Sequence, residues 1–239
     1  MIKIEKIEVW GFEHAIRGMR NPMNSWDKSD SDYCSNIKCR GCRFRGNDPL
    51  CRRFFLTDYI IGRNDIALMQ RLYKAGTEHR KYLRQIFVSM DITAPLYWLK
   101  ELETYKVGTV SNSCSTMHTI HKKPFEMSDF SIEHLSESYD DGEVWYNNEY
   151  PNSSREVFSF IVDAINEYRN KFLETNDKKY WWFMIQTLPS SYNQKRTITM
   201  NYENVMTIIN QRKGHKLDEW NDLVEELYKL PYVREIRGE

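Results

Sequence analysis

The stretch from Leu188 to Arg212, LPSSYNQKRTITMNYENVMTIINQR, contains the end of one helix and the whole of the next. Pro189 cannot continue a helix, so it ends the apolar helical pattern that begins at Asp177. Asn201 is a favourable N-cap residue. Apolar residues then recur at helical spacing, at Val205, Ile208 and Ile209. The sequence therefore predicts a helix that starts at Asn201 and reaches Arg212.

The rest of the chain adds more helices than strands. Apolar residues alternate with polar ones over residues 2–10 and 86–92, which predicts two strands. Helical spacing or end signals predict helices at 13–19, 64–76, 96–105, 153–172, 177–188 and 217–227. Asn64 and Pro95 are the predicted starts of two of them, and Gly76 and Gly108 mark ends. Because helices and strands do not alternate regularly, the predicted fold class is α+β.

The composition indicates one globular domain covering residues 1–239. The chain has 239 residues, 41% of them hydrophobic, which is enough for a large core. Its formal net charge is zero, with 34 basic and 34 acidic residues, so nucleic acid is not the expected partner. No apolar run approaches the length of a membrane span, and the N-terminus lacks a signal-peptide pattern. We therefore expect a cytoplasmic protein without a membrane partner.

Four of the five cysteines lie close together in an expected insertion loop at residues 26–56. They are Cys34, Cys39, Cys42 and Cys51, and the Cys39/Cys42 pair has the spacing of a zinc knuckle. A structural zinc ion, unligated thiols and redox or iron–sulfur chemistry are the three possibilities. The loop is also rich in basic residues, at Lys38, Arg40, Arg43, Arg45, Arg52 and Arg53. They could bind phosphate or form an ordinary solvated surface.

The polar strip TYKVGTVSNSCSTMH, residues 104–118, gathers hydroxyls, amides and one lysine after a predicted helix. Such a strip could hold a phosphate or a polar heterocycle, or it could be an ordinary turn. Cys114 is expected to be buried and inert, with a nucleophilic role as the alternative. The common nucleotide-binding and hydrolase motifs do not occur in the chain.

Together these segments resemble the flavin-dependent thymidylate synthases (ThyX). The resemblance comes from Leu188-Pro189, Thr199-x-Asn201 and Asn210-x-Arg212, and the strip at 104–109 occupies the place of the family's RHR signature. It implies a ThyX-like domain with helices around a small mixed or antiparallel sheet. It also implies FAD-binding residues at His79, Thr104, Tyr105, Lys106, Thr109, Asn210 and Arg212. Substrate-binding residues are implied at Asn112, Ser113, Ser115, Lys195, Arg196 and Glu203.

The signature differs from the family at its charged positions. Thr104, Tyr105 and Lys106 stand for Arg, His and Arg, so only Lys106 keeps a positive charge. Glu203 stands where the family has an arginine that contacts the substrate phosphate, which reverses the sign of that interaction. Lys195 and Arg196, expected on the loop before the helix, are the nearest replacement cations.

The resemblance implies an enzyme that transfers and reduces a one-carbon unit on a uracil nucleotide, dUMP. FAD and methylenetetrahydrofolate would supply the chemistry, and a homotetramer would be the assembly. The alternative is a nucleotide-binding protein of the same fold that has lost catalysis and acts as a sensor or sequestering protein. A zinc-stapled module that binds nucleic acid through the cysteine loop is a third possibility, opposed by the zero net charge.

The cysteine spacing leads to a direct test of zinc binding. Elemental analysis should find about one zinc ion per chain, as expected for four convergent thiolates. A Cys39→Ser, Cys42→Ser double variant should lose the metal and become protease-sensitive between Trp26 and Leu56. Metal-free protein with an equally protected loop would exclude the zinc site.

Overall fold

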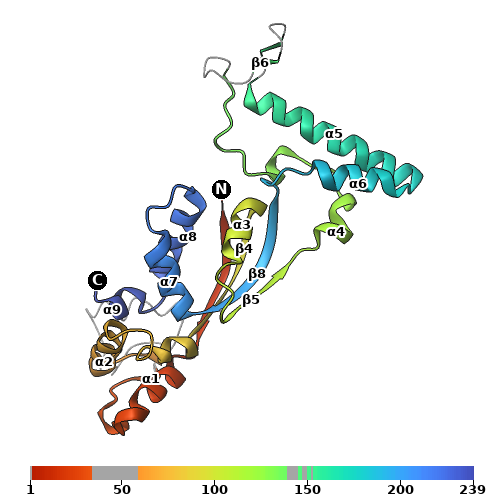
Figure 1. The fold of residues 1–239 in the computed structure, drawn as a ribbon. Coiled ribbons are helices and arrows are strands. Elements are labelled where there is room, and N and C mark those ends of the chain that lie inside the picture. Colours follow the sequence, from red (N-terminus) through yellow and green to blue (C-terminus); the bar gives the residue numbers. More distant parts are fainter. Residues whose placement is uncertain (1, 34–58, 139–144, 147–149, 152) are drawn as a thin grey trace, which may run out of the picture. The chain divides into compact units, whose positions relative to one another are not determined.

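The computed structural model describes residues 2–33, 59–138, 145–146, 150–151 and 153–239 (Figure 1). Its helices are α1 Phe12–Arg20, α2 Arg63–Lys74, α3 Leu96–Leu102, α4 Thr116–Thr119, α5 Ser154–Thr175, α6 Lys178–Thr187, α7 Tyr202–Arg212, α8 Asp218–Lys229 and α9 Val233–Arg237. Its strands are β1 Lys3–Trp10, β2 Asp32–Tyr33, β3 Tyr59–Ile60, β4 Phe87–Pro95, β5 Thr109–Ser113, β6 Trp145–Tyr146, β7 Tyr150–Pro151 and β8 Asn193–Asn201. Single 3-10 turns are η1 Asn21–Met23, η2 Trp26–Lys28, η4 Lys81–Gln85, η5 Ile120–Lys122 and η6 Met127–Asp129. The α+β fold class is confirmed.

The chain divides into two compact units. One contains residues 93–104 and 113–196 with the first residues of the chain, and the other contains residues 4–92, 105–112 and 197–239. A four-stranded sheet in the order β1-β4-β8-β5 draws residues from both. The strands β2 and β3 form a separate antiparallel pair, in which Tyr33 lies opposite Tyr59. Tyr33 and Tyr59, which flank residues 34–58 in the sequence, therefore lie side by side.

The first of these units has its own apolar core around the helices α5 and α6, which pack against each other (Figure 1). This core contains Ile120, Phe125, Phe130, Ile132, Val162, Ile165 and Met184. The predicted capping box is confirmed, because the Ser153 hydroxyl accepts from Glu156 N and the Glu156 carboxylate accepts from Ser153 N. The Asp177 carboxylate likewise caps α6 by accepting from Lys179 N at 3.0 Å.

In the second unit, the strand β4 separates a buried face from a polar one. Val88, Met90 and Ile92 are buried, as the alternating sequence predicts. On the opposite face, Thr197 Oγ1 donates to Asp91 Oδ1 at 2.7 Å. Thr199 Oγ1 donates to Ser89 Oγ at 3.1 Å. Helix α7 packs against α8 and η4, and α1 packs against η4.

Four local predictions were wrong. Lys195 and Arg196 lie in strand β8 rather than on a loop, and the polar strip contains strand β5 and helix α4. Both strands are rich in polar residues, so periodicity alone gave no strand signal. The helix that follows Pro95 ends at Leu102, three residues earlier than the predicted Tyr105. Cys114 is exposed, not buried.

The start of α2 was also predicted wrongly. Gly62, not Asn64, is its N-cap residue. The free N–H groups of the first turn are bound by a residue remote in sequence, since the Asp30 carboxylate accepts from Asn64 N at 3.0 Å and from Asp65 N at 3.3 Å. A capping partner that lies more than thirty positions away cannot be found from local sequence.

A buried ion pair joins α1 to α2. Arg20 Nε donates to Asp65 Oδ1 at 2.6 Å, and both side chains are almost fully buried, with 5% and 0% exposed. The second carboxylate oxygen accepts from the hydroxyls of Ser29 and Ser31 at 2.7 and 2.6 Å and from Asp30 N at 3.2 Å. Every polar atom of the Asp65 carboxylate is therefore bound, as burial of a charge requires.

Replacing Asp65 should destabilise the protein strongly. We expect Asp65→Ala to lower the free energy of unfolding by about 3–5 kcal/mol, because Arg20 would stay buried without a counter-charge. Chemical denaturation measures this. Glu167→Ala is the control: Glu167 pairs with Lys171 on the exposed face of α5, and its loss should cost less than about 0.5 kcal/mol. Equal effects of the two substitutions would contradict the role of the buried pair.

Candidate functional site

The turn at residues 105–109 is held against the N-terminus of α7. Asn201 Oδ1 accepts from Asn204 N at 3.0 Å, which confirms Asn201 as the N-cap. Asn204 Nδ2 donates to Val107 O at 2.6 Å and to Thr109 Oγ1 at 2.8 Å. Gly108 has a φ of +73°, and a Cβ there would lie 2.2 Å from Asn201 Nδ2. Only glycine therefore allows the turn to approach the helix this closely.

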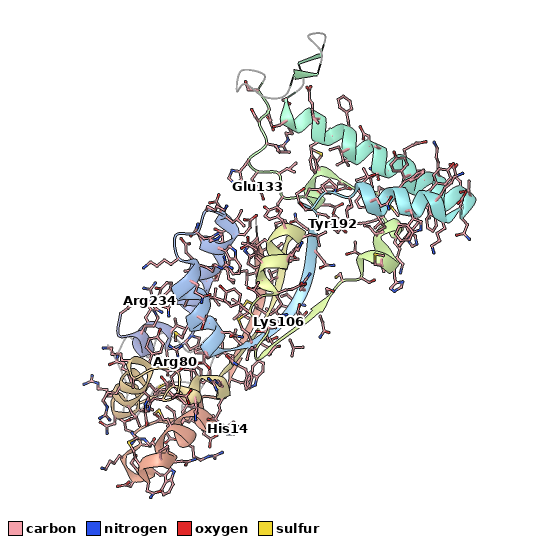
Figure 2. The ribbon with its side chains drawn as sticks, viewed as in Figure 1. His14, Arg80, Lys106, Glu133, Tyr192 and Arg234 are labelled. Atoms are coloured by element: carbon pink, nitrogen blue, oxygen red, sulfur yellow. The ribbon has the colours of Figure 1, made fainter. Side chains whose placement is uncertain are left out.

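Lys106 projects from this turn and is exposed (Figure 2). Within the described part of the chain its ammonium group has no ion-pair partner. Because Asn204 binds the turn on both sides of Gly108, at Val107 O and at Thr109 Oγ1, the backbone that carries the lysine is held in place. The turn thus presents one available cation at the place where the sequence predicts a cofactor contact.

Tyr105 and Arg212, two other predicted cofactor residues, contact each other instead of projecting outward. Arg212 Nε donates to Tyr105 Oη at 2.9 Å, and Tyr105 Oη donates to Gln211 Oε1 at 2.9 Å. The Arg212 guanidinium also lies over the Trp220 ring, 4.4 Å from its centroid. Tyr105 is 8% exposed. These contacts connect the turn to α7 and α8, so both residues have a structural role.

Three further predicted cofactor residues are placed as follows. Thr104 Oγ1 donates to Glu101 O at 2.8 Å at the end of α3. Asn210 accepts from Arg237 at 2.6 Å through Oδ1 and donates to Tyr73 Oη at 3.3 Å through Nδ2. His79 is exposed in the connection between α2 and η4. Within the described residues, the His79 side chain makes no hydrogen bond, unlike those of Thr104 and Asn210.

The predicted substrate residues are spread along two strands and the start of a helix. Asn112 and Ser113 are exposed in β5, and the Ser115 hydroxyl caps α4 by accepting from His118 N at 3.1 Å. Lys195 O accepts from Cys114 N at 3.0 Å. Arg196 is bound within the protein, by Glu103 at 2.7 Å and by Gln194 at 2.9 Å. Its side chain is only 13% exposed, which removes it as an available cation.

Glu203 lies in the first turn of α7 and is held by two arginines. Arg80 Nε donates to Oε1 at 3.3 Å, and Arg84 Nε donates to Oε2. Burial by itself would raise the pKa of Glu203. The hydrogen bonds and charges of Arg84 and Arg80 outweigh burial and hold this pKa below its usual value. The group of three side chains therefore carries one net positive charge.

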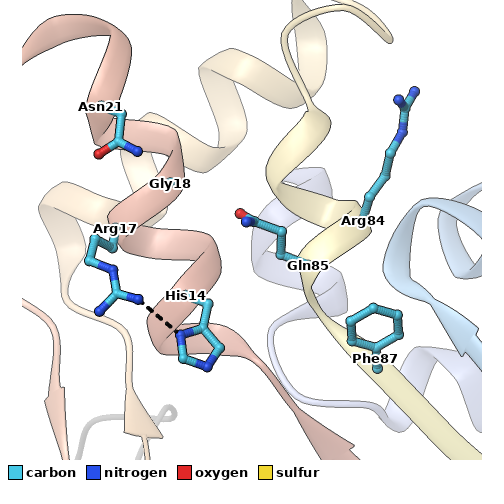
Figure 3. A pocket seen from close by; sticks show the side chains of 7 residues that line it. All are labelled: His14, Arg17, Gly18, Asn21, Arg84, Gln85 and Phe87. Carbon is cyan, nitrogen blue, oxygen red and sulfur yellow. Dashed lines mark hydrogen bonds between the residues drawn. The ribbon is translucent and has the colours of Figure 1, made fainter.

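A pocket of about 480 Å³ lies next to this group, between α1 and η4 (Figure 3). It is lined by His14, Arg17, Gly18, Asn21, Arg84, Gln85 and Phe87. Phe87 stacks on Trp10, with ring centroids 5.9 Å apart and an angle of 21° between the rings. Arg84 thus belongs both to the Glu203 group and to the pocket wall.

These pocket residues were not predicted from the sequence. Arg80 and Arg84 are four positions apart, which could have indicated one face of a helical turn. No local signal brings α1 next to η4, since that packing depends on the tertiary fold. Gly11 makes it possible: its φ is +95°, and a Cβ there would lie 2.1 Å from Gln85 O.

The four cysteines of the predicted zinc site, Cys34, Cys39, Cys42 and Cys51, lie outside the described residues. Among the residues that the structure does describe, no group of three or more His, Cys, Asp or Glu side chains could hold a metal ion. None of the described helices has the length and apolar character needed to cross a membrane.

Comparison with solved structures identifies the architecture. A thymidylate synthase X from Helicobacter pylori, solved with FAD and dUMP, matches 100% of this chain and 98% of its own, with a TM-score of 0.62 and 19% identity. A second structure from the same organism, also with FAD and dUMP, has a TM-score of 0.60, 17% identity and 98% coverage of both chains. The chain has a ThyX-like fold.

A third solved structure extends the comparison. The UMP/dUMP methylase PolB from Streptomyces cacaoi, bound with 5-Br UMP, matches 100% of this chain and 94% of its own, with a TM-score of 0.57 and 10% identity. No family model and no curated protein matches the sequence. The likeness therefore lies in the fold, and it confirms the ThyX-like fold that the resemblance implied.

The lowered pKa of Glu203 leads to a pH-dependent prediction. The ion pairs stabilise the folded state above the ordinary glutamate pKa of about 4.5, and this stabilisation is lost as the pH falls through the lower folded-state pKa. Glu203→Gln should reduce the free energy of unfolding by about 1–2 kcal/mol at pH 7. This difference should disappear below the folded-state pKa, as measured by denaturation between pH 7 and pH 3. A difference that did not change with pH would contradict the pairing, and exposed Glu167→Gln is the control.

Proposed function

We propose that this chain is a ThyX-like enzyme that acts on a uracil nucleotide, adding and reducing a one-carbon unit with FAD and methylenetetrahydrofolate. The observation that carries this proposal is the whole-length likeness to structures solved with FAD and dUMP and to a UMP/dUMP methylase. The likeness covers nearly all of each chain.

The charge around Glu203 supports nucleotide binding. The resemblance placed a carboxylate where the family binds a phosphate, which would repel the substrate if the carboxylate were unpaired. Arg80 and Arg84 pair with Glu203 and make the net charge of the three side chains positive. The Arg84 side chain is 50% exposed. A phosphate oxygen can accept from the nitrogen atoms of Arg84 that do not face Glu203. Arg84 therefore takes the place of Lys195 and Arg196 as the proposed phosphate-binding cation.

The residues present fit FAD in part. Lys106 offers an exposed cation, which suits an anionic pyrophosphate, and exposed His79 offers a further polar group. Tyr105 and Arg212 are bound to one another, so their contribution is to hold the turn that carries Lys106. When bound, FAD would supply hydride transfer and carry the one-carbon unit. The protein would supply position and charge.

A second candidate function is nucleotide binding without catalysis, as in a sensor or sequestering protein. Tyr105 favours it, because a buried tyrosine in internal hydrogen bonds replaces the histidine of the family signature. Both candidates require a nucleotide site. They differ only in whether the bound nucleotide is methylated when FAD and methylenetetrahydrofolate are present.

Measuring FAD binding by the wild-type protein and by a Lys106 variant distinguishes both candidate functions from a protein that has the fold but binds neither FAD nor nucleotide. We expect purified protein to bind FAD, and Lys106→Ala to weaken that binding by about 1–3 kcal/mol through loss of a charge-assisted hydrogen bond. The melting temperature should stay unchanged, because Lys106 is exposed. Fluorescence titration with FAD measures the affinity, and Lys100→Ala, an exposed lysine on α3, is the matched control.

The reaction itself is tested by incubating the protein with dUMP, reduced FAD and methylenetetrahydrofolate and analysing the nucleotide by mass spectrometry. A methylated product supports the enzyme. Binding of FAD and dUMP without product supports the second candidate. Absence of FAD binding by the wild-type protein would overturn the proposal that this chain is a flavoprotein.

A further inference from the structure

Three basic side chains gather around the ring of Tyr228, near the end of α8 in the second unit. Lys213 Nζ lies 5.9 Å from the ring centroid, and the guanidinium carbons of Arg234 and Arg237 lie 4.8 and 5.6 Å from it. A tyrosine ring attracts each cation through its negative face. Like charges held this close together repel one another, so an anion among them stabilises the whole group.

Arg237 is fixed along one edge and offers the other edge to an oxyanion. Its Nη1 donates to two neutral groups, Asn210 Oδ1 at 2.6 Å and Tyr73 Oη at 3.3 Å. Its Nε and Nη2 donate to Glu239 Oε1 at 3.0 and 2.7 Å. The Arg237 side chain is only 13% exposed. A guanidinium held in place by neutral partners keeps its full charge and a fixed orientation toward the anion.

The Glu239 carboxylate shows where an anion lies in this group. Its hydrogen bond with Arg237 holds the pKa of Glu239 below the usual value against a small opposing effect of burial, and the charges of Arg237 and Lys213 act in the same direction. The Glu239 side chain is 40% exposed, so an anion from solvent can take its place. Within the described residues, Lys213 and Arg234 form no ion pair.

A fourth cation lies beside the group, at the end of α2. A Cβ on Gly238, the residue that follows Arg237, would lie 3.7 Å from Lys74 Nζ. Lys74 is exposed and, in the part of the chain that the structure describes, it also forms no ion pair. The four cations are therefore accompanied by a single bound carboxylate, that of Glu239.

We propose that these four cations form a binding site for a compact oligophosphate, meaning two or more linked phosphates, which displaces the Glu239 carboxylate from Arg237. Linked phosphates carry several negative charges at short spacing, which suits several cations around one carboxylate. The free edge of Arg237 binds one phosphate through two parallel hydrogen bonds, and the other three cations neutralise the rest.

The site recognises phosphates and not a base. Cations lie over the Tyr228 ring, so this ring supports the charges and is not a stacking surface for a planar ligand. A free oligophosphate and the tail of a nucleoside triphosphate share the required chemistry. The site does not depend on the proposed function, because it contains neither Lys106 nor the group formed by Arg80, Arg84 and Glu203.

Calorimetric titration of the full chain without divalent cations tests the ligand class. The ligands are tripolyphosphate, orthophosphate, citrate and ATP. We expect tripolyphosphate to bind at least tenfold more tightly than orthophosphate or citrate, because only linked phosphates combine the Arg237 contact with the charge that the other cations require. Both possible results for ATP support the site and identify the source of the ligand. Equal affinity for ATP and tripolyphosphate indicates a nucleoside triphosphate, and weaker ATP binding indicates a free oligophosphate.

Variants test the location of the site and the displacement of Glu239. A Lys213→Ala, Arg234→Ala double variant should weaken tripolyphosphate binding at least tenfold with little change in melting temperature, because both side chains are exposed. Arg237→Lys keeps the charge, loses the paired hydrogen bonds and should weaken binding about fivefold. Glu239→Gln removes the competing carboxylate and should strengthen binding at least threefold. Lys178→Ala, an exposed lysine on α6, is the control and should leave the affinity unchanged.

Three results would contradict the proposal. Equal affinity for citrate and tripolyphosphate would overturn the phosphate assignment. Unchanged affinity in the Lys213→Ala, Arg234→Ala double variant would overturn the location. Weaker binding in Glu239→Gln would overturn the displacement. Each of these results leaves the proposed function standing, since FAD binding and methylation of dUMP are measured separately.

Discussion

The buried Arg20–Asp65 ion pair is the constraint on which the described part of the second unit depends. It joins the last turn of α1 to the first turn of α2, and the same carboxylate fixes residues 29–31 through Ser29 and Ser31. A charge without water must be fully paired, so this geometry tolerates little displacement. Because α1 also carries His14 and Arg17, the ion pair helps to set the position of one pocket wall.

The second organising principle is the redistribution of charge around α7. The helix dipole stabilises the negative charge of a glutamate in the first turn of a helix. The ion pairs with Arg80 and Arg84 stabilise the charged form of Glu203 further. The positive charge that the family resemblance leads one to expect on α7 is found on the segment packed against it. An anion approaching the pocket therefore meets a net positive group, although the residue on α7 itself is acidic.

Local signals in the sequence were sufficient for much of the fold. The caps at Ser153, Asp177 and Asn201 and the alternation in β4 all formed as predicted, because each depends on neighbours within a few positions. Features that depend on distant partners were not predicted. These include the cap that Asp30 provides for α2 and the polar strands β5 and β8. The pocket was missed for the same reason, since α1 and η4 are about sixty residues apart in the chain.

The predicted site residues separate into those that build the fold and those that remain available to a ligand. Tyr105 and Arg212 bind each other, and Asn204 fixes the turn through Thr109, so these polar groups have their hydrogen bonds within the protein. Lys106 and Arg84 keep exposed charge. The Tyr105 phenol, which stands where the resemblance implies a histidine, thus makes its hydrogen bonds within the protein, and these bonds help to hold the turn. The turn keeps Lys106 as its cation, while Arg84 of η4 and Arg17 of α1 place further positive charge on the wall of the pocket.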